Sequence, residues 1–65
     1  MTDANQVLAA LQFAYPSGLS AGQIAWQLSL PLYRVESALA ELVRHGLAAF
    51  DAEQARYIYR PKRVT

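Results

Sequence analysis

The segment from Leu19 to Leu47 constrains the fold of this chain more than any other part of the sequence. Apolar residues recur there at helical spacing, in two runs separated by a short turn. Ser20 precedes the first run with Gln23 three residues later, the spacing of a capping box, and Gly46 follows the second run as a left-handed C-cap. The pattern predicts two short amphipathic helices joined by a tight turn and followed by a strand-like run.

The inner faces of these two helices follow from their apolar positions. Pro31 suits the first turn of the later of these two helices, which is the third helix of the chain, because the N–H group that proline lacks has no partner there. The positions predicted to face the core are Ile24, Ala25, Leu28, Val35, Ala38, Leu39, Leu42 and Val43.

Another helix is predicted before this segment. It begins near Asp3, which has Gln6 at capping-box spacing. It ends at residues 16–18, because Pro16 cannot continue the hydrogen-bond ladder and Gly18 permits a turn. Its predicted inner face consists of Ala4, Val7, Leu8, Leu11, Ala14 and Tyr15.

The last part of the chain has the spacing of strands. Leu47–Phe50 and Arg56–Tyr59 are predicted to pair as a hairpin, and Pro61 ends the pairing. The connection, residues 51–55, contains no glycine, asparagine or proline, so the turn itself is weakly indicated. Two arrangements stay open, in which either the tyrosines of the second strand or Ile58 face the core.

Length and composition limit the chain to one small domain. It has 65 residues, of which 54% are hydrophobic and 17% charged, and this composition argues against disorder. The absence of cysteine excludes disulfides and thiolate metal sites. No segment resembles a signal peptide or a membrane span, so we expect a cytoplasmic location without membrane contact.

Charge is distributed unevenly along the chain. Residues 1–55 hold two arginines and five acidic residues, a net charge of −3, whereas residues 56–65 hold four basic residues, a net charge of +4. The basic end indicates either a local contact with an anion or a solubilising tail.

The order of these elements resembles the winged helix-turn-helix family. The residues that carry the likeness are Leu19, Ser20, Ile24, Ala25, Leu28, Val35, Ala38, Leu39, Leu42, Gly46 and Leu47, with the aromatic strand of Tyr57 and Tyr59. The resemblance implies an α+β, mainly α fold, in which a three-helix helix-turn-helix core is followed by a two-stranded β-hairpin wing. It makes residues 1–65 a single domain with a core at about residues 4–60 and a basic tail at residues 61–65. Because many members are small bacterial transcription regulators, the resemblance implies a DNA-binding regulator.

In such a domain the third helix enters the major groove of double-stranded DNA. With its apolar side inward, its outward positions are Tyr33, Ser37, Ala40, Glu41 and Arg44. Side chains near its N-terminal end carry donors that match base edges or phosphates, and the predicted groove contacts are Tyr33, Arg34 and Ser37. The predicted phosphate contacts are Arg44, Arg56, Arg60, Lys62 and Arg63.

Acidic residues oppose DNA binding on the same surfaces. Glu36 and Glu41 place negative charge on the third helix, and Glu41 is predicted to pair locally with Arg44 or His45. The hairpin tip carries acidic rather than basic residues, Asp51 and Glu53. About four phosphate contacts give one copy only modest affinity, so tight binding requires a homodimer on two half-sites.

Phe13 and Trp26 are predicted to lie opposite the inner faces of the first two helices. Two alternatives stay open: the hairpin or tail covers one of them, or they form a contact surface for a homodimer or a protein partner. The second alternative predicts a different function, that of a protein-interaction module (an accessory subunit or antagonist) that docks its partner through Phe13, Trp26 and the third helix.

We expect no catalytic activity, cofactor, metal or small-molecule substrate. His45 is the only histidine, and its place in the last helical turn favours a capping role over a ligand role. The serines have no base at a suitable spacing, and the glycines are scattered rather than gathered in a phosphate-binding loop. A domain of this size also has little room for a closed pocket.

Overall fold

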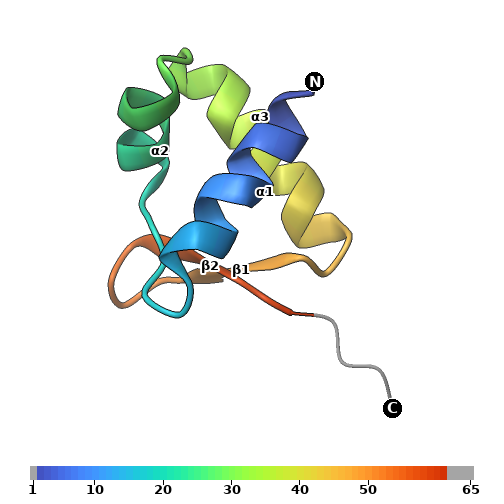
Figure 1. The fold of residues 1–65 in the computed structure, drawn as a ribbon. Coiled ribbons are helices and arrows are strands. Elements are labelled where there is room, and N and C mark those ends of the chain that lie inside the picture. The colour runs from blue at the N-terminus through green and yellow to red at the C-terminus, as the bar shows by residue number, and fades with distance from the viewer. Residues whose placement is uncertain (1, 62–65) are drawn as a thin grey trace.

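The computed structural model describes residues 2–61, along which three helices precede a two-stranded antiparallel sheet. The elements are α1 (Asp3–Ala14), α2 (Ala21–Leu28), α3 (Leu32–Arg44), β1 (Ala48–Asp51) and β2 (Arg56–Tyr59). Figure 1 shows α1 crossing in front of α3, with α2 beside them and the hairpin under the helices. The predicted α+β, mainly α fold with a terminal hairpin is confirmed.

α1 begins at Asp3, as predicted, but its N-cap lies one residue earlier than the capping-box spacing indicates. Thr2 is the N-cap, and its hydroxyl accepts a hydrogen bond from the Asn5 N–H at 3.2 Å. The predicted cap at Asp3 is therefore wrong. Asp3 is the first residue of α1, and its carboxylate binds Arg34 instead of the helix backbone.

The predicted capping box of α2 is confirmed. The Ser20 hydroxyl accepts from the Gln23 N–H at 3.2 Å, and the Gln23 side chain accepts from the Ser20 N–H at 3.0 Å. Pro31 lies at the N-cap of α3, one residue before the predicted place, and gives that helix no side-chain cap. Its carbonyl accepts from the N–H groups of Arg34 and Val35, so α3 starts on backbone bonds alone.

Gly46 ends α3 as the sequence predicts. Its φ of +75° places it in the left-handed region, and its N–H donates to the Val43 carbonyl at 3.0 Å. The next N–H, of Leu47, donates to the Leu42 carbonyl at 2.9 Å. Together these bonds form a Schellman motif, which turns the chain sharply from α3 into β1.

The core lies where the three helices and β1 meet. Its buried members are Val7, Leu11, Ile24, Val35, Ala38, Leu39, Leu42 and Ala48. Two predicted inner residues are wrong, because Val43 is 41% exposed and Tyr15 is 48% exposed. Val43 lies about 100° around the helix from Leu42, beyond the edge of the buried stripe, and Tyr15 follows the last residue of α1.

The hairpin resolves the alternative that its sequence left open. β1 pairs with β2 from Ala48–Tyr59 to Asp51–Arg56, so β1 begins one residue later than predicted. Tyr57 and Tyr59 pack against the core, which makes the tyrosine side the inner face. The turn that lacks glycine is made with Ala55 in the left-handed conformation, at a φ of +55°.

Gly18 allows the hairpin to lie close to the connection between α1 and α2. Leu19 and Tyr57 form a two-way backbone bridge, with N–H to carbonyl distances of 2.9 and 2.7 Å. A Cβ atom on Gly18 would stand only 2.5 Å from the Tyr57 carbonyl oxygen. The glycine that was predicted to permit a turn therefore also fixes the position of β2.

Candidate functional site

The outer side of α3 is the surface that the sequence predicts to meet DNA. All five predicted outward residues of this helix are exposed, and Tyr33 is exposed by 71%. Ser37 lies one turn beyond both Tyr33 and Arg34, so these three side chains adjoin near the start of α3. We call the exposed residues Tyr33, Arg34, Ser37 and Arg44 the α3 surface.

Arg34 is held by an ion pair across the helix interface. Its Nε and Nη2 atoms each donate to one carboxylate oxygen of Asp3 at 2.7 Å, a bidentate geometry. These hydrogen bonds hold the pKa of Asp3 below its ordinary value and raise the pKa of Arg34. The side chain of Arg34 nevertheless stays 45% exposed. Three of its five N–H donors stay free of Asp3, so the predicted groove contact can reach DNA while the ion pair is intact.

Glu41 lacks the local partner that the sequence predicts for it. The Asp3–Arg34 pair is the one ion pair that residues 2–61 contain, so Glu41 pairs with neither Arg44 nor His45. Glu36 is exposed as well. The middle of α3 therefore presents two uncompensated carboxylates beside the proposed groove contacts.

Of the cations after residue 55, the two that the structure describes, Arg56 and Arg60, lie at opposite ends of β2 and form no continuous stripe. Arg56 lies at the turn end of β2 and donates from Nη1 to the Ser17 carbonyl at 3.2 Å, which fastens the hairpin to the loop after α1. Arg60 follows the other end of β2, about 13 Å away along an extended strand. Lys62 and Arg63 lie outside the described residues.

A second exposed surface lies on α1 and α2. Phe13 is 90% exposed and Trp26 is 86% exposed, so the predicted outward orientation of both is confirmed and no described residue covers them. Between the two helices is a hollow of about 400 Å³, lined by Gln6, Ala9, Ala10, Phe13, Gln27 and Leu28. Gln27 also lines a neighbouring hollow beside Trp26, which makes the surface continuous.

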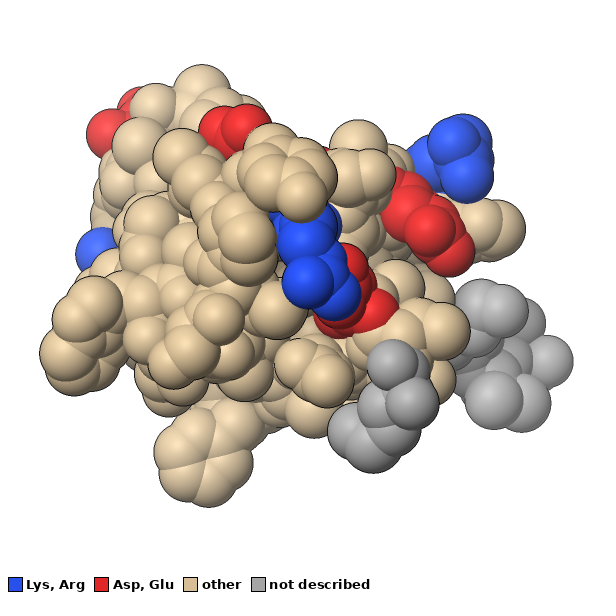
Figure 2. Space-filling view, turned by 90° about the horizontal axis from the view of Figure 1, so that it is seen from above, with Lys and Arg blue, Asp and Glu red and all other residues tan. Residues whose placement is uncertain are grey.

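We call this surface, comprising Gln6, Ala9, Ala10, Phe13, Trp26, Gln27 and Leu28, the aromatic face. No charged residue occurs between Asp3 and Arg34, so the whole of α2 and all of α1 after its first residue are neutral. The lower left of Figure 2, on the side of α2, is tan without a break, whereas the charged side chains in view lie elsewhere.

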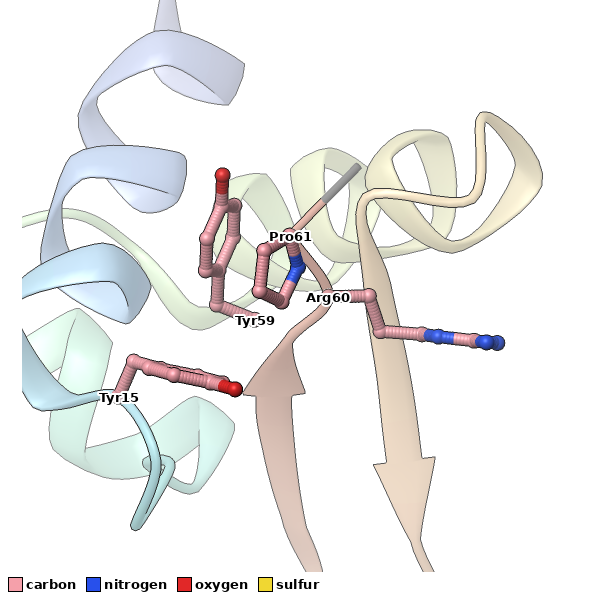
Figure 3. Close-up of a pocket in the computed structure, with 4 residues that line it drawn as sticks. All are labelled: Tyr15, Tyr59, Arg60 and Pro61. Atoms are coloured by element: carbon pink, nitrogen blue, oxygen red, sulfur yellow. The ribbon is translucent and has the colours of Figure 1, made fainter. Parts of the chain in front are cut away.

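A further hollow, of about 360 Å³, lies where β2 ends, lined by Tyr15, Tyr59, Arg60 and Pro61. Figure 3 shows the Arg60 side chain extending away from both tyrosine rings. The rings meet edge to face, with centroids 5.8 Å apart. The arrangement explains how the hairpin packs against the end of α1, and it gathers no group of catalytic character.

Other kinds of site find no support in the part of the chain that the structure describes. Residues 2–61 bring together no cluster of three metal-ligating side chains, and none of their helices is long and apolar enough to span a bilayer. Comparisons with protein-family models, curated proteins and solved structures gave no match. The likeness to winged helix-turn-helix domains rests on the sequence pattern alone.

Two features of the surfaces were missed by sequence reasoning. The pairing of Asp3 with Arg34 joins residues 31 positions apart, and no local spacing signals it. The second feature is the uncharged span between the same two residues, which the sequence itself contains. Such a span indicates that α1 and α2 together present a neutral surface.

Proposed function

We propose that the chain binds double-stranded DNA through the α3 surface. The observation that carries the proposal is the division of α3 into a fully packed inner side and an exposed outer side. Val35, Ala38, Leu39 and Leu42 fix the helix against the core, so Tyr33 and Ser37 project from a rigid support. A rigid exposed helix of this kind is what entry into a major groove requires.

Each side chain of the α3 surface has a contact that its chemistry suits. Arg34 can offer two of its free N–H donors to guanine while Asp3 holds its other edge, and Ser37 can donate to a base or a phosphate. Tyr33 can donate to a phosphate oxygen. Because α3 begins without a side-chain cap, its first N–H groups can also donate to a phosphate oxygen.

The spacing of the cations limits what one copy achieves. Arg34 and Arg44 stand about 15 Å apart along α3, and the exposed Glu36 and Glu41 lie between them. Arg56 already donates to a carbonyl. We therefore expect one copy to bind non-specific duplex with a Kd of about 10⁻⁴ to 10⁻⁶ M, so that site-specific binding needs two copies.

Opposite substitutions of the Asp3–Arg34 pair test the proposal most sharply. Fluorescence anisotropy with a labelled duplex measures the affinity of the wild type, Arg34→Ala and Asp3→Asn. Arg34→Ala should weaken binding about tenfold, because a donor to DNA is lost. Asp3→Asn should strengthen binding a few-fold, because a negative charge beside the phosphates is removed and Arg34 keeps its full positive charge for DNA.

Thermal unfolding of the same variants is the control. Both substitutions break the same pair, so a purely structural role lowers the Tm of both and leaves DNA affinity equal for both. Equal affinities, or no binding of duplex at low salt, would refute the proposal. Tyr33→Ala provides an independent variant, since its exposed side chain has no hydrogen bond within the described chain.

A further inference from the structure

The aromatic face exposes two large side chains that no described residue covers. We infer that its occupant is a second copy of this chain, which packs the same face against it about a two-fold axis. The inference goes beyond DNA binding and does not depend on it, because the aromatic face contains no residue of the α3 surface.

The exposed area is of the size that such an interface needs. A standard interface covers about 800 Å² on each partner, which is roughly a sixth of the 4609 Å² surface described for this chain. Covering Phe13 and Trp26 removes about 300–450 Å² from water, since each is almost fully exposed. The two aromatics thus supply about half of the area, and the alanines, glutamines and Leu28 around them lie where they can supply the rest.

The lack of charge on the aromatic face also favours a second copy. A partner that places a charged side chain against this face removes that charge from water without providing an opposite charge, because positions 4 to 33 contain no charged residue. A second copy brings an equally neutral face. Its polar members, Gln6 and Gln27, carry amides that both donate and accept, so each can pair with a glutamine of the other copy.

The shape of the face is self-complementary. In a two-fold dimer, if one residue contacts a second position of the partner, that second position in its own copy is contacted by the first residue of the partner. Phe13 is almost fully exposed at a hollow that is also lined by the small side chains of Ala9 and Ala10. Each copy therefore offers one aromatic side chain and one hollow, and the two-fold axis places the Phe13 ring of each copy in the hollow of the other.

Pairing through the aromatic face leaves α3 available. Figure 1 shows α3 running behind α1. Tyr33, Ser37 and Arg44 are exposed on α3, and Arg34 binds α1 through Asp3, which is not part of the aromatic face. Two copies joined through α1 and α2 would carry two unobstructed α3 surfaces.

Sedimentation velocity on the full chain without DNA, from micromolar to millimolar concentration, tests the inference. The wild type should move to the mass of two chains as concentration rises. Phe13→Ala should weaken this association about 30-fold or more, as expected for a central aromatic anchor. Trp26 is the only tryptophan, so its emission should shift to shorter wavelength with concentration in the wild type and not in Phe13→Ala.

Matched substitutions on α3 serve as controls. Tyr33→Ala also removes an exposed aromatic, and Ala40→Lys adds to α3 the charge that Ala9→Lys adds to the aromatic face. Ala9→Lys should abolish pairing, whereas both α3 variants should pair like the wild type. Circular dichroism confirms that each variant folds.

Three results would overturn the inference. If the wild type stays monomeric at all concentrations, a second copy is excluded as the occupant of the aromatic face. This holds even if the chain associates with a different protein. A dimer that survives both Phe13→Ala and Ala9→Lys uses another surface. Equal losses of self-association in Ala9→Lys and Ala40→Lys would show that the added charge itself, and not its position on the aromatic face, prevents pairing. None of these results bears on the binding of duplex by the α3 surface.

Discussion

The aromatic face and the α3 surface rest on the same core, but they present opposite chemistry. The first joins two neutral helices and exposes Phe13 and Trp26, whereas the second carries arginines and carboxylates on one helix. Burial of apolar area drives contacts at the first and is insensitive to charge screening. Contacts at the second surface depend on attraction between charged groups, which salt screens. One small core can thus support two interactions that respond differently to conditions.

The largest expected difference between the two surfaces is in how strongly salt weakens the contacts that each makes. If four of the six basic residues of the chain, including those of the α3 surface, neutralise phosphates, a tenfold rise in sodium chloride lowers the DNA association constant roughly 4,000-fold. Self-association through the aromatic face should change by no more than about twofold, because no charge is buried there. Anisotropy titrations and sedimentation velocity at matched salt concentrations measure the two dependences. DNA affinity that is flat in salt, or pairing that is lost in salt, would remove the distinction.

Gly18→Ala should disconnect the hairpin from the helices that carry the aromatic face. The added Cβ would stand 2.5 Å from the Tyr57 carbonyl oxygen and 2.8 Å from Ile58 Cγ1, at a φ of +84°. We expect a loss of about 3 kcal/mol or more in the free energy of unfolding. Gly46→Ala shares the left-handed backbone but meets no atom within 4 Å, so it should cost only about 1–2 kcal/mol. Urea denaturation followed by circular dichroism gives both values, and equal losses would show that the close approach is unimportant.

Features set by neighbouring residues were predictable from the sequence. The capping box of Ser20 and the left-handed Gly46 were both confirmed, because capping needs only local side chains and backbone. The helical period also identified Phe13 and Trp26 as outward. Local patterns failed at edges: Thr2 and Asp3 are both good caps one residue apart, and Val43 adjoins the buried stripe without entering it.

Contacts between distant elements were not predictable in this way. Arg56 donates to a carbonyl 39 positions away, and the angle at which the hairpin meets the helices decides this bond. The inner face of β2 depends on how closely Tyr57 can approach Gly18. The turn was weakly indicated because Ala55 adopts a conformation that glycine or asparagine usually occupies. These features follow from three-dimensional packing, which spacing along the chain does not encode.

Two serines should show opposite phenotypes on the two surfaces. Ser20→Ala removes the hydroxyl that caps α2, the helix of Trp26, and should cost about 1 kcal/mol of unfolding free energy. Ser37→Ala removes an exposed hydroxyl without a hydrogen bond among the described residues, so stability should change by less than about 0.5 kcal/mol. DNA affinity should fall for Ser37→Ala and stay constant for Ser20→Ala. Denaturation and anisotropy on both variants test this, and a shared phenotype would contradict it.

Acid should produce the smallest effect, at the one ion pair that links α1 to the α3 surface. The folded pKa of Asp3 lies below its ordinary value of 3.8, so the pair contributes stability above that pH and loses it as pH falls through the lowered pKa. The Tm of the wild type should therefore exceed that of Asp3→Asn at neutral pH, and the two should converge in acid. Glu36→Gln, at an exposed carboxylate without an ion pair, should show no such convergence. A gap that persists in acid would assign the loss to asparagine at the start of α1, and the ion pair itself would then contribute little to stability.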